Sequence, residues 1–351
     1  ESAVELEYAE KLLMIPDLMN YYLTGVAANE YTDATMSLMV DQKRKEWNKY
    51  LLNELGIRQD IFCSIVMPGN VLGNLSQKIC NEFEVPSIPV VNVASHDTAS
   101  AIAGIPLRIS GDDWAFISLG TWAIYGVETE EQYISREVFE SGFANQGGCE
   151  GKTNFVNLFT GLWVIQQCYE RWCKDAGKKI GWNTVVSEAE KARSGKVFID
   201  LDAPEFAQPN PNMPLEIQKY CQKNGQEVPE GIGEISRCIF ESLVLKFKQC
   251  YCDVQRFTGK KTRVLYLVGG GSKNKLLCQW TADALGIPVM AGPAETTSVG
   301  NLLLQLKASK EIDSLDDGRR IAGASADSKE YLPSDSEKWD EYYNRYYNSR
   351  N

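Results

Sequence analysis

Apolar positions recur every three or four residues over several stretches of the chain, which is the spacing of one face of an α-helix. The longest stretch runs from Glu234 to Phe257, and six apolar residues share the spacing there: Ile235, Ile239, Leu243, Phe247, Cys250 and Val254. Gly259 follows, and glycine often ends a helix. We therefore expect a long amphipathic helix here, and further helices at 1–25, 44–56, 157–172, 274–285, 299–308 and 335–349.

Continuous apolar runs between these helices predict buried strands. IPVVNVA at 88–94, RVLYLV at 263–268 and IPVM at 287–290 are such runs. AFISLGTWAIYGVE at 115–128 has a Gly-Thr interruption between two strand-like halves, which predicts a hairpin. Strands that alternate with helices indicate an α/β fold. The hairpin adds antiparallel strands, so we expect a mixed sheet rather than a purely parallel one.

Composition narrows the class of protein. The chain has 351 residues, so two or three domain-sized units are expected. A net charge of −11 argues against nucleic acid or an anionic membrane as a partner. Ten cysteines without a C-x-x-C pair, together with one histidine, give no zinc or other metal site, and we expect reduced thiols in a cytoplasmic protein. Cys221 and Cys238 flank a loop and could pair under oxidation.

The only histidine, His96, lies in ASHDTASA, directly after the apolar run that ends at Ala94. One interpretation is local: Ser95 or Asp97 caps a helix that begins near Thr98. The other is chemical. Asp97 would be a general base at the carboxyl end of a strand, where active sites of α/β sheets lie. A carboxylate there can accept the proton of a hydroxyl that attacks phosphorus.

Three glycine-containing loops are further candidates for chemistry. SLGTW at 118–122 is either a plain β-turn or a phosphate loop, in which Gly120 allows close approach and Thr121 donates hydrogen bonds. LVGGGSKN at 267–274 is either a tight strand-to-helix turn or a nucleotide contact at a helix N-terminus. It lacks the G-x-G-x-x-G spacing, which disfavours a dehydrogenase. GGCEGKT at 147–153 is one residue too short for a Walker A loop.

The order of these motifs resembles the FGGY family of carbohydrate kinases over nearly the whole chain. The resemblance rests on ASHDTASA, SLGTW, NQGGCEGKTNF with GLWVIQ, and VGGGSKNKLLCQWTADALGIPVMAGPAETTSVGN. SHDT points to the rhamnulokinase branch, whose members transfer the γ-phosphate of ATP to the 1-hydroxyl of L-rhamnulose. The resemblance implies ribonuclease-H-like domains of the actin and hexokinase type, with ATP and Mg²⁺ as cofactors and a sugar as substrate. It leaves homo-oligomer formation open.

By motif, the resemblance assigns residues to two substrates. Asp97 resembles the catalytic base and contacts the sugar together with His96, Thr98 and Asn157. The nucleotide contacts are Thr121, Gln166, Gly270 and Asn274. The family has a sugar-binding asparagine three residues before the glycine of GLW, and Leu158 occupies that position here. A kinase for L-fuculose or another ketose therefore remains an alternative.

The resemblance also implies a domain organisation. Residues 1–109 would be the remainder of the N-terminal sugar-kinase domain, 110–332 the C-terminal nucleotide-binding domain and 333–351 a C-terminal helix. The family begins with an Asp-containing glycine hairpin that holds phosphate and magnesium, and nothing like it precedes ESAVELEYAEK. We therefore expect an incomplete first domain and no activity from this chain alone. A non-catalytic nucleotide-binding fragment of the same fold is the remaining alternative.

Overall fold

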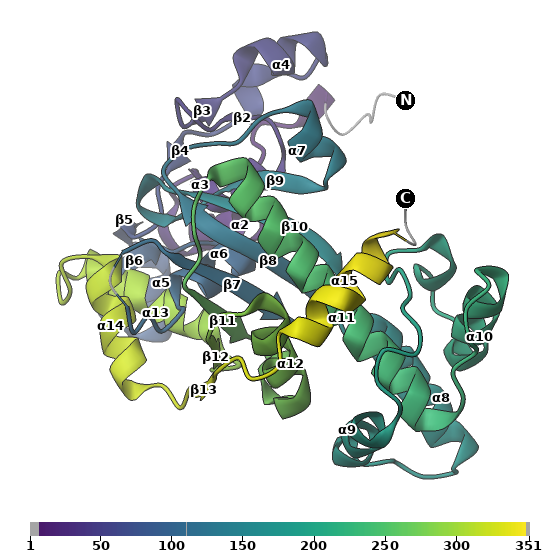
Figure 1. Ribbon diagram of the computed structural model, residues 1–351. Coiled ribbons are helices and arrows are strands. Elements are labelled where there is room, and N and C mark those ends of the chain that lie inside the picture. Colours follow the sequence, from purple (N-terminus) through teal and green to yellow (C-terminus); the bar gives the residue numbers. More distant parts are fainter. Residues whose placement is uncertain (1–6, 110, 349–351) are drawn as a thin grey trace.

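The computed structural model describes residues 7–109 and 111–348, and its central element is a seven-stranded mixed sheet (Figure 1). The strand order is β13-β12-β11-β7-β8-β10-β9. β7, β11 and β12 run parallel, and the other neighbours are antiparallel, as expected for a mixed sheet with a hairpin at 115–128. The bounds are β7 (Trp114–Leu119), β8 (Trp122–Thr129), β9 (Phe143–Gly147), β10 (Thr153–Thr160), β11 (Val264–Val268), β12 (Val289–Ala291) and β13 (Lys329–Tyr331).

A long helix, α11 (Gly231–Thr258), crosses one face of this sheet (Figure 1). The six apolar residues expected on its inner face are all buried, and each such burial contributes about 1.5–3 kcal/mol. Further helices contribute buried residues to the same core, among them α8 (Trp163–Asp175), α9 (Trp182–Lys191), α10 (Met213–Lys223), α12 (Lys275–Leu285) and α15 (Glu337–Asn348). The prediction of α11 is confirmed. It could be made from the sequence because an apolar stripe of this length fits no other periodicity.

The opposite face of the sheet is covered by α6 (Asp97–Ala103), with α13 (Thr296–Ala308) and α14 (Leu315–Ser325) behind it. Arg319 of α14 is buried and pairs with Glu128 of β8, at 2.7 Å between Nη2 and Oε1. The same guanidinium donates to the carbonyls of Ile102 and Ala103. A buried charge is tolerated when its donors are satisfied in this way, so Arg319 fixes the C-terminal end of α6 to the sheet.

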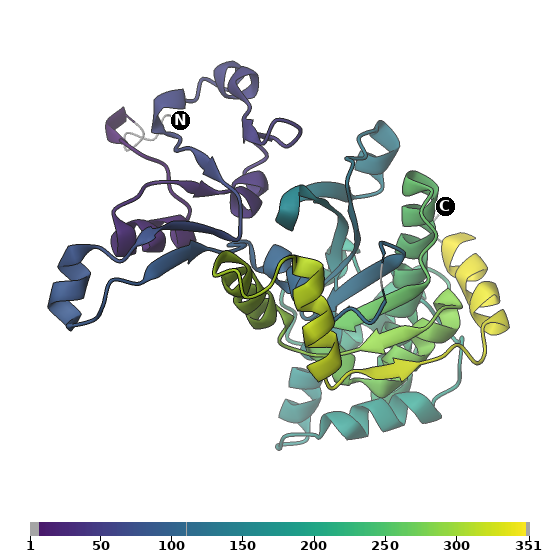
Figure 2. The same ribbon diagram turned by 90° about the vertical axis from the view of Figure 1, so that its left-hand side faces the viewer.

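Residues 7–100 contain smaller two-stranded units. β1 (Asn29–Glu30) pairs in parallel with β4 (Ile65–Val66), and β2 (Val40–Asp41) pairs with β3 (Glu46–Trp47). β5 (Asn70–Asn74) and β6 (Pro89–Asn92) form an antiparallel ribbon which, with α5 (Gln77–Phe83), extends away from the large sheet (Figure 2). The remaining helices are α2 (Ile15–Thr24), α3 (Tyr31–Met36), α4 (Lys49–Glu54) and α7 (Arg136–Glu140).

Several sequence expectations need correction. The run 88–94 is not a strand buried on both faces, because β6 pairs only with β5 and most of its side chains are half-buried or exposed. The expected helix 157–172 is two elements: β10 continues to Thr160, and α8 begins at Trp163. The helices expected at 1–25 and 44–56 are shorter, and residues 1–6 lie outside the described part. The domain limits at 109 and 332 stay predictions.

Helices α6 and α13 are in direct backbone contact. A Cβ on Gly300 would overlap the carbonyl oxygen of Ser100 and would lie 3.0 Å from the amide nitrogen of Gly104. A Cβ on Gly104 would in turn lie 2.5 Å from the nitrogen of Gly300. Ser100 Oγ also donates to the carbonyl of Thr297 at 2.9 Å. The two backbones therefore touch directly, and only glycine fits at the crossing.

We predict that Gly300→Ala destabilises the protein, although alanine normally stabilises a helix relative to glycine by about 1 kcal/mol. The new methyl group meets backbone atoms that cannot rotate away, and overpacking of this kind costs about 1–3 kcal/mol. Thermal unfolding should show a lower midpoint for Gly300→Ala than for wild type. Leu302→Ala is the matched control, since Leu302 lies on the same helix and is exposed. A Gly300→Ala midpoint at or above that of wild type would contradict the described crossing.

Candidate active site

A cavity of about 490 Å³ lies where the loops after β7 and β11 meet α8 and α9. Residues from both loops and three helices line it: Gly120, Thr121, Leu162, Ile165, Gln166, Trp182, Asn183, Val186, Phe240, Gly270, Gly271, Lys273 and Asn274. The four residues expected to contact a nucleotide are all among them, although they are up to 153 positions apart in the chain, from 121 to 274. The turns supply Thr121, Lys273 and Asn274, and the helices supply most of the apolar lining together with the amides of Gln166 and Asn183.

The three glycines after β11 have different tasks. Gly269 has a φ of +83°, and a Cβ there would lie 2.8 Å from the carbonyl oxygen of Leu119 in β7. A Cβ on Gly271 would lie 2.9 Å from the Cβ of Leu119. These two glycines therefore serve the turn and its packing on β7. Around Gly270 nothing lies within 4 Å of a Cβ position, so this glycine faces open space in the cavity.

The turn between β7 and β8 is bound to the start of α8. Leu162 N–H donates to the carbonyl of Gly120 at 2.8 Å, and Gly161 N–H donates to the carbonyl of Thr121 at 3.0 Å. Thr121 Oγ1 donates to Gln166 Oε1 at 3.1 Å, so the two predicted nucleotide contacts meet across this junction. On the far side, Asn274 caps α12 by accepting the N–H of Leu277 at 3.2 Å. Its oxygen therefore has a structural partner.

Asp97 lies at the first position of α6 and presents its carboxylate to solvent, with a side chain that is 84% exposed. His96 occupies the cap position, and its side chain makes no cap hydrogen bond. Asp97 Oδ1 accepts the N–H of Thr98 at 2.7 Å and lies 3.8 Å from His96 Nε2. Neither Ser95 nor Asp97 is therefore the cap residue of this helix. His96 Nδ1 is buried without a hydrogen-bond partner among the described residues.

Two residues that we did not single out from the sequence hold this loop in place. Glu30, the cap of α3, accepts the N–H of Ser95 at 3.1 Å, and Thr32 Oγ1 accepts the N–H of His96 at 3.3 Å. Burial raises the pKa of Glu30 to about 7, although the hydrogen bonds that it accepts lower this pKa. Glu30 and Thr32 are distant from Asp97 in sequence, and their spacing is that of an ordinary helix start. No sequence signal therefore distinguished them.

Asn157 is not brought to Asp97. In β10, Phe155 and Phe159 pack in the core on the α11 face, whereas Val156 packs with Ile102 of α6 on the opposite face. Alternation along the strand places Asn157 on the α11 face, where its Nδ2 donates to the carbonyl of Ser141 at 2.8 Å. Leu158 is on the α6 face and is 57% exposed. A shift of one residue thus moves the side chain to the other face of the sheet.

The GGCEGKT loop and the cysteines, which the sequence analysis also considered, have roles in the fold. GGCEGKT joins the antiparallel strands β9 and β10, so it is not a strand-to-helix phosphate loop. All ten cysteines are free thiols. Cys221 and Cys238 are buried, and their hydrogen bond to each other, together with burial, raises the pKa of Cys238. Within residues 7–109 and 111–348, no helix has the length and apolar character to cross a bilayer, and no His, Cys, Asp and Glu side chains cluster as metal ligands.

The single histidine allows a direct test of this loop. Burial lowers the pKa of His96, and Asp97 and Asp33 raise it in part. We predict that NMR titration of its one imidazole signal gives a midpoint below the usual value of about 6.5. The unfolded chain then binds this proton more readily, so the contribution of His96 to the free energy of unfolding should decrease as the pH falls below about 6.5, opposite in sign to that of Glu30.

Asp97→Asn is the matched control for this titration. It removes a negative charge that favours the imidazolium ion, and the side chain keeps almost the same volume. The midpoint of His96 should fall further in that variant. A wild-type midpoint above about 6.5 would mean that the two carboxylates outweigh burial, and that the loop is more open to water than described.

Comparison with known proteins finds the same family that the order of the motifs indicated. Residues 2–104 match the N-terminal domain of the FGGY family of carbohydrate kinases, and residues 115–309 match its C-terminal domain. The chain is 35% identical over 338 residues to a rhamnulokinase of Bacteroides thetaiotaomicron, which covers 96% of this chain and 68% of the relative. It is 37% identical over 333 residues to a rhamnulokinase of Enterococcus faecalis, with 94% and 66% covered.

Solved structures show the same fold. A ligand-bound xylulose kinase from Lactobacillus acidophilus superposes with a TM-score of 0.76 at 15% identity, covering 97% of this chain and 67% of that one. A Plasmodium falciparum glycerol kinase with ADP gives 0.74 at 16% identity, covering 96% and 65%. The chain thus spans about two thirds of the length of these proteins, and the prediction of an actin-type mixed α/β fold is confirmed. On the evidence of both matched domains and of these relatives, this chain belongs to the FGGY family of carbohydrate kinases.

Proposed function

We propose that this chain is part of a cytoplasmic kinase that transfers the γ-phosphate of ATP to the 1-hydroxyl of L-rhamnulose. The observation that carries the proposal is the convergence of Thr121, Gln166, Gly270 and Asn274 on one cavity. The rhamnulokinases among its relatives support the choice of sugar. Because the chain spans about two thirds of their length, the activity is proposed for the product of the complete gene.

Asp97 is the general base in this proposal. Its exposed carboxylate accepts the proton of the sugar 1-hydroxyl as that oxygen forms a bond to the γ-phosphorus. The bond between the γ-phosphorus and the bridging oxygen breaks, and ADP leaves with that electron pair. The side chain of His96, which is 16% exposed beside Asp97, contacts a second sugar hydroxyl in this proposal, together with Thr98. Holding the hydroxyl in this orientation supplies a large part of the rate.

The polar lining of the cavity is suited to the nucleotide phosphates. Thr121 offers a hydroxyl, Gly270 leaves room for close approach, and Lys273 brings a positive charge to the same wall. Mg²⁺ usually binds to phosphates with only one or two protein carboxylates. The described residues contain no carboxylate cluster that would hold a metal, so Mg²⁺ would be held here mainly by the nucleotide phosphates.

A second candidate substrate is L-fuculose or another ketose. Leu158 occupies the position where the family has a sugar-binding asparagine, and it is exposed on the face of the sheet that α6 covers. A coupled assay of ADP release with a panel of ketoses separates the candidates. The highest kcat/KM for L-rhamnulose supports the first, and a higher value for another ketose supports the second.

We predict that Asp97→Asn in the product of the complete gene lowers kcat about 10²–10⁴-fold, which is the usual loss when a general base is removed. The amide has almost the shape of the carboxylate but cannot accept the proton. ADP release should be measured with L-rhamnulose and MgATP, and ADP affinity by calorimetry should stay near that of wild type. Turnover within a few-fold of wild type would remove Asp97 from the role of base.

We predict that Gly270→Val weakens ADP binding at least tenfold while the protein still folds. Gly270 has room for a side chain in the described structure, so the branched side chain would occupy the cavity rather than strain the backbone. Calorimetry with ADP measures the effect, and the unfolding midpoint measures the fold. Unchanged ADP affinity would mean that the nucleotide does not approach this turn.

A further inference from the structure

Trp182 is an aromatic residue of the cavity wall that no motif pointed to. It is the first residue of α9 and lines the cavity together with its neighbour Asn183. One face of its indole stacks on the ring of Tyr169, with centroids 4.2 Å apart and an interplanar angle of 11°. The side chain nevertheless remains 44% exposed. A large apolar ring that lines the cavity is thus stacked on one neighbour and still partly exposed.

The support behind Trp182 continues into the backbone. Tyr169 Oη donates to the carbonyl of Ile180 at 2.7 Å, so the residue that stacks on Trp182 also holds the turn that leads to it. The N–H of Ile180 donates to Cys173 Sγ at 3.3 Å. The turn between α8 and α9 is therefore bound to α8 at two points, and the indole is positioned before any ligand arrives.

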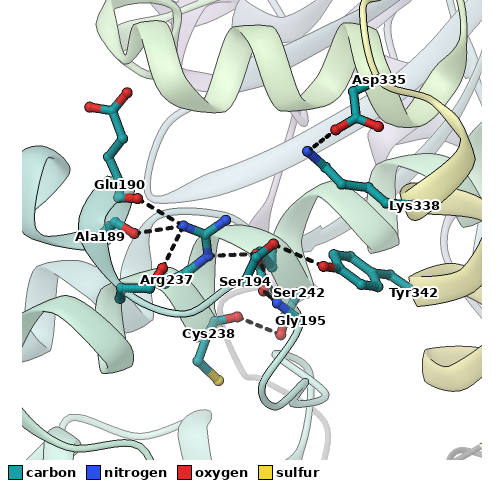
Figure 3. Close-up of polar contacts among 12 residues, drawn as sticks. Ala189, Glu190, Ser194, Gly195, Arg237, Cys238, Ser242, Asp335, Lys338 and Tyr342 are labelled. Carbon is teal, nitrogen blue, oxygen red and sulfur yellow. Dashed lines mark hydrogen bonds and ion pairs between the residues drawn. The ribbon is translucent and has the colours of Figure 1, made fainter.

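The other end of α9 is fixed as well. The guanidinium of Arg237 donates to the carbonyls of Ala189 and Glu190, at 3.1 and 3.0 Å (Figure 3). Arg237 is held in turn by Glu241, at 2.7 Å between Nε and Oε1. A cation at a helix C-terminus satisfies carbonyls that have no partner within the helix. With both ends bound, α9 presents Trp182 on a rigid support, which lowers the entropy cost of binding a ligand there.

The residues around Trp182 indicate the chemical class of that ligand. Ile165, Val186 and Phe240 bring apolar surface from three helices, and the turns bring Thr121 and Lys273. Apolar surface beside a polar, partly cationic wall matches a molecule with an aromatic ring at one end and anionic groups at the other. A nucleotide has this form, and stacking on an aromatic side chain contributes about 1–3 kcal/mol per base.

We propose that Trp182 is the residue on which the nucleotide base stacks, and that it favours purine over pyrimidine nucleotides because a purine covers more of the indole. This inference rests on the proposed function, since it places the base of the proposed cosubstrate. Trp182 takes no part in the chemistry. Its role is to set affinity and base preference, with Tyr169 as its positioning residue.

The test compares ADP, UDP and inorganic pyrophosphate by calorimetry on wild type, Trp182→Ala and Trp182→Phe. Trp182→Ala should bind ADP about tenfold to a hundredfold more weakly. Its affinity for pyrophosphate should stay the same, and its preference for ADP over UDP should shrink. Trp182→Phe should bind ADP within a few-fold of wild type. Phe139→Ala is the control, because Phe139 is 81% exposed and does not line this cavity.

A spectroscopic readout makes the test specific to contact with the base. ADP should change the tryptophan fluorescence of wild type, and the change should be lost in Trp182→Phe while ADP binding persists. Wild-type ADP affinity in Trp182→Ala, or an equal loss for pyrophosphate and ADP, would overturn the inference and leave the proposed function standing. Absence of ADP binding by wild type would overturn both.

Discussion

The contact between α6 and α13 is the constraint on which the proposed site depends. The first helix carries Asp97 at its N-terminus, and the second follows the strand next to β11 in the large sheet. Because Gly104 and Gly300 let the two backbones touch, no side chain at the crossing can repack to change their separation. Arg319 binds the C-terminal end of α6 at the carbonyl of Ile102 and also pairs with Glu128 of β8. The position of the carboxylate relative to the sheet is thus set by backbone contacts at the crossing and by the ion pair between Arg319 and Glu128.

Close contacts at glycines also position the loops of the nucleotide cavity. Gly269 and Gly271 bring the turn after β11 against Leu119, and the next residues after Leu119 form the turn that carries Thr121. The two loops are therefore adjacent because their strands are adjacent and parallel. Helices α8 and α9 close the cavity with apolar surface, and their connection is bound by Tyr169. The loops after the strands supply Thr121, the glycines and Lys273, and the helices supply most of the apolar lining, which suits a ligand with a base and phosphates.

Long elements and local motifs could be predicted from the sequence. The apolar stripe of α11 and the hairpin of β7 and β8 follow from periodicity, and each motif predicts its own loop. What the sequence does not contain is which loops meet. The convergence of Thr121 and Gly270 depends on strand order, and Glu30 reaches Ser95 only through the tertiary fold. Asn157 shows the limit most clearly, because one residue of register decides which face of the sheet a side chain occupies.

Errors in the prediction have related causes. The helix expected at 157–172 wrongly included the end of β10. Only two residues separate this strand from α8, so the sequence of both elements looks like one apolar segment. Trp182 was overlooked because a single aromatic residue at a helix start carries no pattern, and only its stacking on Tyr169 and its place on the cavity wall reveal it.

The central claim is that four segments distant in the sequence form one nucleotide site. Hydrogen–deuterium exchange of the protein with and without saturating ADP tests it most directly, because each segment is read separately. The account predicts slower exchange on ADP addition at 119–122, 162–167, 180–186 and 270–275, with little change in the ribbon formed by β5 and β6. Protection confined to other segments, or none at saturating ADP, would contradict it.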